Sequence, residues 1–243
     1  YGHRDDNPAA RAAAREALGP WLAEGRARLA AEGEPLEPFR GAVVSNELFD
    51  ALPAQPWRWT GEGWEREMLG ATGPFWEAAD PGEAGAWFEA QGGEGLEPGD
   101  GAPWAAGLPR LVADLAAPME EVVDRVLSED GIAARLIAKG ADLRRYRGHA
   151  VDGRWWEEPG ACDLTADVDF TRLAGLLEAA GLRADRLQGL GRWIRTHAPL
   201  AAWEAAWASL PEEERRARTR NLLELTLPER MGDRFRVLEA WRG

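Results

Sequence analysis

Apolar and polar positions along the chain follow strand-like and helix-like periods in turn. Ala42 to Ser45 is a short apolar run rich in β-branched residues, which predicts a strand buried on both faces, as in a parallel sheet. The segments Gln55 to Thr60 and Trp64 to Leu69 alternate around Gly61-Glu62-Gly63, and this pattern predicts a β-hairpin. Arg234 to Trp241 alternates again, so we expect an edge strand that closes the sheet.

Helical periods fill much of the remaining chain. The stretch from Ala9 to Ala31 is rich in Ala, Arg, Glu and Leu and predicts a helix broken at Gly19-Pro20. Leu108 to Ser128 predicts a second helical stretch, interrupted near Pro118, and Gly131 to Ala138 predicts the next strand.

Two helical regions are expected in the C-terminal half. Asp163-Leu164-Thr165 is placed to cap a helix that begins near Asp169 and ends at Gly181. Trp203 to Arg220 predicts an amphipathic helical region, because Leu210 to Glu214 is a strong internal helix-start signal. Strands and helices in this order predict an α/β fold.

The stretch from residue 70 to residue 109 shows little periodicity. It is rich in Gly, Pro, Glu and Trp, and we interpret it as an irregular insertion or a substrate lid. We expect residues 1–243 to form a single domain, with 70–109 as the insertion and 199–220 as a helical addition.

Composition narrows the class of protein. Hydrophobic residues make up 45% and charged residues 29%, as in a globular domain. No apolar run is long enough to span a bilayer and no signal peptide is visible, so we expect no membrane association. The net charge of −13 disfavours a nucleic-acid partner but leaves a protein partner open, and the sequence does not indicate an oligomeric state.

Cysteine and histidine content argues against a metal site. The single cysteine, Cys162, excludes an internal disulfide and suits the reducing cytoplasm, where we expect the protein to reside. His3 and His197 have no companions that suggest metal ligation. We therefore predict no bound metal.

Polar residues follow the predicted strand at Ala42 to Ser45. Asn46 and Glu47 stand where that strand ends, and ligands of open α/β sheets bind beyond the carboxyl ends of the strands. Leu48 to Leu52 resembles one turn of a packing helix, with Asp50 near its start. The alternative interpretation is an ordinary strand-turn-helix connection in which Asn46 caps the helix and Glu47 has no special role.

Three further segments accompany Asn46 to Pro53, whose sequence is Asn-Glu-Leu-Phe-Asp-Ala-Leu-Pro. They are Leu143-Arg-Arg-Tyr-Arg-Gly-His149, Pro159-Gly-Ala-Cys-Asp-Leu-Thr-Ala-Asp-Val-Asp-Phe170 and Met231-Gly-Asp-Arg-Phe-Arg-Val-Leu238. The four segments resemble, in the same order, motifs of the MidA family. This family of S-adenosylmethionine-dependent methyltransferases includes the mitochondrial complex I assembly factor that acts on arginine.

The resemblance implies a fold and a reaction. The fold would be the Rossmann-like class I methyltransferase sheet with helices on both faces, and the cofactor would be S-adenosyl-L-methionine. The reaction would transfer a methyl group to a protein arginine, with Glu47 holding the guanidinium and assisting loss of its proton. Asn46 would position substrate or cofactor, and His149 would accept a proton or form a polar pocket wall.

Other residues complete the implied site. Asp5 would stand at the end of the second strand and bind the cofactor ribose, next to Ser45 and Asn46 as further cofactor contacts. Asp50 and Tyr146 are the candidate substrate contacts. A different interpretation of Asp5 is equally open, because Asp5-Asp6-Asn7-Pro8 is also a helix-start signal for the helix that follows.

The chain departs from the family pattern at three places. No glycine-rich cofactor loop precedes Tyr1, Ala138-Lys139 replaces the first two residues of an Asp-Tyr-Gly motif, and Asp167 replaces a histidine. One hypothesis from these losses is a catalytically inactive scaffold or assembly factor that binds a partner protein. Another is that the glycine-rich loop lies upstream of Tyr1 in the natural protein.

Overall fold

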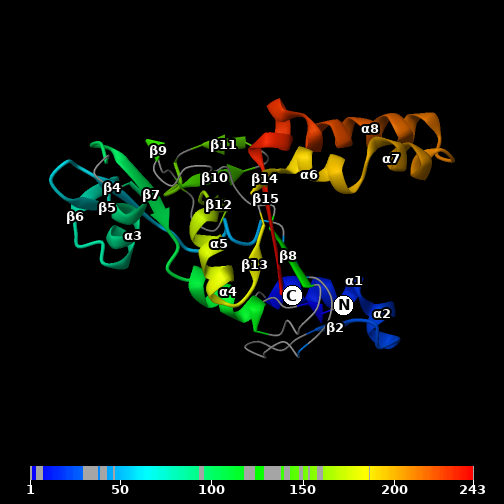
Figure 1. Cartoon of the computed structure of the whole chain (residues 1–243), viewed down its shortest axis with the longest axis horizontal. Helices are drawn as coiled ribbons and strands as arrows, with labels where there is room; N and C mark the ends of the chain where they lie inside the picture. The colour runs from blue at the N-terminus through cyan, green and yellow to red at the C-terminus, as the bar shows by residue number, and fades with distance from the viewer. Residues whose placement is uncertain are drawn as a thin grey trace.

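The computed structural model describes residues 2–3, 8–29, 38, 43–45, 47–92, 96–117, 124–128, 138–139, 143–147, 150–152, 154–157, 161–185 and 187–242. Figure 1 shows a central sheet with helices packed on it, a second sheet at one end, and at the opposite end the C-terminal helical arm and the N-terminal helices. The central part positions the candidate site.

The central sheet is mixed. Its strand order is β13-β15-β8-β3, and β14 also pairs with β15. The strands are β3 (Val43–Ser45), β8 (Asp124–Ser128), β13 (Arg183–Ala184), β14 (Gln188–Gly189) and β15 (Arg236–Arg242). β3 and β8 are parallel, whereas β15 runs antiparallel to β8. A mixed α/β architecture is thus confirmed.

Two predictions for this sheet were wrong. β15 is an internal strand and not an edge strand, because β8 pairs with one side of it and β13 and β14 with the other. The charged positions suggested a solvated face, yet Glu239 is buried as well as Leu238 and Ala240. Residues 124–128 form strand β8 and not the end of a helix, so the helix predicted from Leu108 stops at Ala116.

Two helices cover one face of the central sheet. α4 (Leu108–Ala116) and α5 (Phe170–Ala179) pack together over Leu238 and Ala240, and Leu173 and Leu177 are almost fully buried there. α5 is capped by Asp169 itself, whose side chain accepts the Arg172 N–H, and not by residues 163–165 as predicted. Those three residues instead form a strand.

The segment predicted to be an irregular insertion is regular. It contributes two strands to an antiparallel sheet of order β6-β5-β4-β7-β9, and a helix that packs on this sheet. The elements of this antiparallel unit are β4 (Gln55–Trp59), β5 (Trp64–Gly70), β6 (Gly73–Ala78), α3 (Glu83–Gly92), β7 (Asp100–Trp104) and β9 (Ala138–Lys139). The β4–β5 hairpin was predicted and is confirmed. A buried aromatic core of Trp57, Trp64 and Phe88 holds α3 on this sheet, and it compensates for the weak strand preferences of Gly and Pro.

The N-terminal residues form a small separate group. α1 (Pro8–Ala17) and α2 (Gly19–Ala23) confirm the predicted helix break, but β2 (Arg28–Leu29) follows where the helix was expected to continue. β2 pairs in parallel with β1 (Gly2–His3). Of the strand predicted over residues 131–138, only Ala138 falls within the described residues, where it belongs to β9.

Three strands form a sheet beside the central one. Its order is β11-β10-β12, with β10 (Arg144–Arg147) between β11 (Ala150–Asp152) and β12 (Asp163–Thr165). Both pairings are antiparallel. These strands carry two of the family-like segments, and they lead directly into Asp167 and the start of α5.

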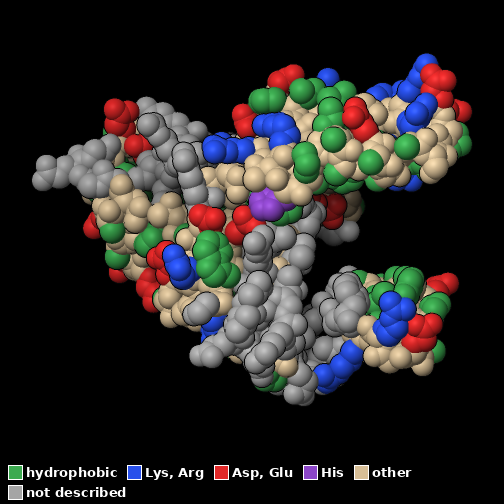
Figure 2. Space-filling model, turned by 45° about the vertical axis from the view of Figure 1, so that its right-hand side comes forward, with side chains coloured by type: hydrophobic (Ala, Val, Ile, Leu, Met, Phe, Trp, Pro, Cys, Tyr) green, Lys and Arg blue, Asp and Glu red, His purple; other side chains and the backbone are tan. Residues whose placement is uncertain are grey.

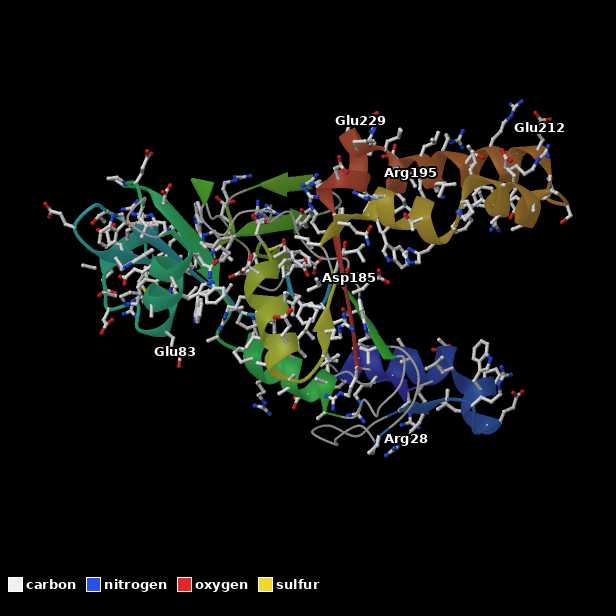
Figure 3. The ribbon with its side chains drawn as sticks, viewed as in Figure 1. Arg28, Glu83, Asp185, Arg195, Glu212 and Glu229 are labelled. Atoms are coloured by element: carbon white, nitrogen blue, oxygen red, sulfur yellow. The ribbon has the colours of Figure 1, made fainter. Side chains whose placement is uncertain are left out.

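The helical arm comprises α6 (Leu190–His197), α7 (Leu200–Trp207) and α8 (Glu212–Thr226), followed by η2 (Pro228–Gly232). In Figure 3, Arg195 on α6 points toward α8, and its Nη1 donates to the Thr226 carbonyl over 2.8 Å. Gly191 allows the close approach, because a Cβ there would lie 2.3 Å from the Thr226 oxygen. Within the described part of the chain, no helix has the length and apolar character that a membrane crossing needs.

Candidate functional site

Two parallel strands end side by side in the central sheet. Ser45 is the last residue of β3 and pairs with Ser128, the last residue of β8. Ser45 is buried, with a relative exposure of 6%. The crevice beyond the carboxyl ends of parallel strands is the usual ligand site of an α/β sheet, so the residues that follow Ser45 are the first candidates.

Glu47 has an unusual backbone conformation. It is the one non-glycine residue among those described with a positive φ, at 50°, and its side chain is exposed. The left-handed region disfavours residues with a Cβ and is frequent at functional sites. The helical turn predicted for residues 48–52 is absent: these residues form bends and a turn, with Phe49 buried in the core.

The turn after β3 is fixed against the segment that precedes α5. The backbone N–H of Ala166 donates to the Asp50 carbonyl over 2.9 Å. A cavity of about 20 Å³ lies between the two segments, and it holds about one water molecule. Its lining includes Phe49, Leu52, Asp167, Asp169 and Arg172. The structure therefore brings the Asp50 backbone next to acidic residues that sequence reasoning did not select.

Asp167 is paired with a cation. Its carboxylate accepts a hydrogen bond from Nη2 of Arg144 on β10, and the two side chains are 29% and 24% exposed. Burial lowers the pKa of the Arg144 guanidinium, but the hydrogen bond and charge of Asp167, with a contribution from Tyr146, raise it above its ordinary value. Arg144 is therefore always charged in this pair.

A second polar cluster joins the antiparallel unit to α5. Nε1 of Trp87 donates to Asp169 Oδ2 over 2.8 Å, and Nη1 of Arg172 donates to the Ala105 carbonyl over 2.8 Å. The Arg172 guanidinium also stacks on Trp104, 3.4 Å from the ring centre. A sequence signal existed for Asp169 as a helix cap, whereas nothing in the local pattern marked Trp87 or Arg172 as its partners.

Burial shifts both charged groups of this cluster. It raises the pKa of the Asp169 carboxyl above its ordinary value, although hydrogen bonds from Arg172 and Trp87 act in the opposite direction. Burial likewise lowers the pKa of the Arg172 guanidinium, against the favourable charges of Asp169 and Glu83. Both groups are hydrogen-bonded and serve to hold the two parts together.

The remaining predicted site residues fall into two groups. Asp5, Asn46 and His149 lie outside the described residues. Tyr146 is half-buried on β10 and faces Asp163 of β12 in the strand register. The structure thus joins Asp50 to the Asp167 segment and places Ser45 and Glu47 at the strand end, while the roles assigned to all of them stay predictions.

His197 is the last residue of α6, the first helix of the helical arm. Its Nε2 is 3.9 Å from Glu239 Oε1, and its ring stacks on Trp193 at 4.7 Å between centres. Figure 2 shows acidic and basic side chains interspersed with hydrophobic ones over the surface of the helical arm. Among the residues that the structure describes, no group of three or more His, Cys, Asp or Glu side chains is arranged to hold a metal ion.

Comparison with known proteins gives a family match. A family described as "Putative S-adenosyl-L-methionine-dependent methyltransferase" matches residues 5–188 of the 243-residue chain. S-adenosyl-L-methionine, the cofactor predicted from the sequence motifs, is the cofactor of that family. A search of curated protein sequences finds no relative of the chain.

Two similar solved structures both come from Burkholderia thailandensis. One is a COG1565 superfamily member, described as a candidate methyl transferase and bound to S-adenosyl-homocysteine; it is 20% identical with a TM-score of 0.81. The other, an uncharacterised COG1565 superfamily protein, is 21% identical with a TM-score of 0.80. Each alignment covers 100% of this chain but only 64% and 66% of the respective solved chains, so the chain spans about two thirds of their length.

Proposed function

The chain belongs to the family of S-adenosyl-L-methionine-dependent methyltransferases, and from this premise we propose that it transfers a methyl group from that cofactor to a protein side chain. One observation carries the proposal. Glu47 adopts a left-handed conformation two residues after the end of β3, at the edge where parallel strands β3 and β8 end. A strained acidic residue at that edge is expected of a binding site and is not required by a simple connection.

The residues at the strand ends fit part of a cofactor site. Ser45 offers a hydroxyl beside the crevice, and Asn46 and Asp5 would add an amide and a ribose-binding carboxylate by the family resemblance. The cavity of about 20 Å³ is far too small for a nucleoside, so the cofactor would lie beyond the strand ends and not in that cavity. When bound, the cofactor supplies an electrophilic methyl group on a sulfonium.

The remaining chemistry belongs to the chain. Glu47 would hold the acceptor nitrogen by a charge-assisted hydrogen bond and favour loss of its proton. Asn46 would orient the acceptor, and His149 would receive the proton or line the pocket. Positioning does most of the work, because a sulfonium is already a good leaving group.

Arginine is the acceptor that we propose, by resemblance to the MidA family. The support lies in the acidic side chains near the strand ends, since a guanidinium binds planar carboxylates through paired hydrogen bonds. Asp50 and Tyr146 would complete the substrate contacts. We also propose a cytoplasmic location and a protein partner, without nucleic acid or membrane, from the negative charge and the cysteine content.

A calorimetric titration with S-adenosylhomocysteine tests the proposal. Binding by the folded chain, or by a version extended to the length of the solved relatives, is the expected result. An absence of heat from both folded proteins would contradict it and would support the alternative function below.

A substitution separates binding from chemistry. Glu47→Gln is expected to leave the affinity for S-adenosylhomocysteine nearly unchanged and to reduce methyl transfer by at least about 100-fold, because the amide cannot take up a proton. The readout is transfer of a labelled methyl group to arginine-containing peptides. Glu62→Gln, in the exposed β4–β5 turn, is the matched control and should retain activity. Full activity of Glu47→Gln would remove Glu47 from the mechanism.

The second candidate function is a scaffold without catalysis. Ala138 and Lys139, which replace the acid and aromatic residues of the family motif, pair with β7 as strand β9. Those positions therefore extend the antiparallel sheet of this chain. A scaffold would bind a partner protein without binding the cofactor, and the titration above distinguishes the two functions.

A further inference from the structure

The Arg144–Asp167 pair lies beside the small cavity between the β3 turn and α5. Asp167 lines that cavity, and its carboxylate is bound by Arg144 of β10 in the neighbouring sheet, which is not itself a lining residue. Roughly three quarters of each side chain is shielded from solvent, at 24% and 29% exposure. The pair is thus partly accessible from the surface and connects two segments that sequence motifs place near the substrate.

The other charged groups of the cavity are already committed to structure. Asp169 caps α5 and accepts the Trp87 N–H, and Arg172 binds the Ala105 carbonyl and stacks on Trp104. Breaking those contacts would separate α5 from the antiparallel unit. Asp167 differs, because Arg144, which binds it, is a flexible side chain from another element and can move away without disturbing a helix.

Arg144 already occupies the Asp167 carboxylate, and the cavity beside that carboxylate is too small to offer a separate place for a ligand. At about 20 Å³ it has room for about one water molecule and none for a guanidinium. A ligand that pairs with Asp167 therefore has to displace the Arg144 guanidinium. Partly exposed ion pairs contribute little net stability, so such an exchange is energetically accessible.

We propose that Asp167 forms a binding subsite for a guanidinium group and that Arg144 occupies this subsite as a displaceable stand-in for the ligand. A guanidinium is favoured over an ammonium, because a carboxylate can accept two parallel hydrogen bonds from it, and Arg144 shows that a guanidinium nitrogen can bind this carboxylate. The inference rests on the proposed function only in identifying the ligand with the methyl acceptor. The binding itself requires no cofactor.

The test is a titration of the chain with N-acetyl-arginine amide in the absence of cofactor, monitored by NMR or calorimetry. Arg144→Gln is expected to lower the dissociation constant at least tenfold, because the competing guanidinium is gone. Asp167→Asn is expected to abolish the binding. N-acetyl-lysine amide should bind Arg144→Gln more weakly than the arginine probe does.

Arg66→Gln is the matched control. It removes the Arg66–Glu77 ion pair, of 3.1 Å, from the β5–β6 hairpin and leaves the cavity intact, so the affinity should stay that of the unmodified chain. Thermal melting of every variant confirms that it is folded. The proposal is overturned if folded Arg144→Gln binds the arginine probe no more tightly than the unmodified chain, or if Asp167→Asn still binds it.

The outcomes also separate this inference from the proposed function. Tighter arginine binding by Arg144→Gln together with no binding of S-adenosylhomocysteine would support the subsite and contradict the methyltransferase activity. Binding of S-adenosylhomocysteine, without tighter arginine binding by Arg144→Gln, would contradict the subsite and support the methyltransferase activity.

Discussion

The Asp169 carboxylate makes structural hydrogen bonds in a partly buried position where its charged form is disfavoured. It caps α5 and accepts the Trp87 N–H, but burial raises its pKa above the ordinary value. A folded state with a raised carboxyl pKa binds a proton more tightly than the unfolded state does. The contribution of Asp169 to stability is therefore greatest at acid pH and is lost as the pH rises through its ordinary range to the raised pKa.

Asp169→Asn tests this pH dependence. Asparagine keeps the cap and an acceptor for Trp87 but does not ionise. The unfolding free energy of the variant, measured relative to the unmodified chain in urea, should rise as the pH increases from below the ordinary carboxyl range through the raised pKa of Asp169. Asp163→Asn, an exposed carboxyl on β12, is the control and should follow the unmodified chain. If the unfolding free energy of Asp169→Asn changed with pH in the same way as that of the unmodified chain, burial of this carboxyl would not affect the pH dependence of stability.

At the residue scale, sequence reasoning identified the strand-end position and missed the contacts that surround it. Glu47 was selected because ligands gather beyond strand ends, but its left-handed backbone has no signature in a sequence without glycine there. Trp87 and Asp169 are 82 positions apart, so no local period could pair them. The pair follows only from the packing of α3 against the start of α5.

Among the elements, α5 has the most readable boundaries. Gly181 follows its C-terminus with φ of 84°, and the Leu182 N–H donates to the Leu177 carbonyl over 3.0 Å. This is the Schellman arrangement, in which glycine is favoured because a Cβ is strained at positive φ. The stripe of leucines and the final glycine together predicted the end of this helix correctly.

Two glycine substitutions in and after α5 should have opposite effects. Gly181→Ala is expected to lower the free energy of unfolding by about 1 kcal/mol, because alanine is strained at this φ. Gly175→Ala, in the helix interior with nothing within 4 Å of the added methyl group, is expected to raise it by about 0.5–1 kcal/mol. Urea unfolding monitored by circular dichroism measures both. Destabilisation by both variants would show that the space around α5 is more restricted than the structure indicates.

Element predictions failed where tertiary packing outweighs local preference. Residues 70–109 lack a clear period because their Gly and Pro positions weaken strand signals, yet β6 and β7 form against β5 and β4. Residues 124–128 continue a helical pattern in the sequence, but in the structure they form strand β8, which pairs with β3 and β15 in the central sheet. Both errors arise because these strands form by pairing with residues distant in the sequence, which the periodicity of a short sequence window cannot reveal.

At the scale of the whole molecule, a few polar contacts connect the antiparallel unit to the central core. Asp169 of the core accepts a hydrogen bond from Trp87 of the antiparallel unit. Arg172 donates to the carbonyl of Ala105, which follows β7, and stacks on Trp104 of β7. Each buried hydrogen bond contributes about 1 kcal/mol, and those to charged groups somewhat more. These contacts should make the two parts unfold together.

The double variant Trp87→Phe/Arg172→Met is expected to uncouple them. Six of the 13 tryptophans lie within residues 55–104, so nearly half of the fluorescent side chains report on the antiparallel unit, whereas circular dichroism reports on all helices. In the unmodified chain the two signals should change at the same urea concentration, and in the double variant the fluorescence should change first. Trp203→Phe/Arg195→Met removes bonds of 2.8 Å each within the helical arm and should leave the transitions coincident. If the transitions of the Trp87 and Arg172 double variant also coincide, these polar groups are not what couples the two parts.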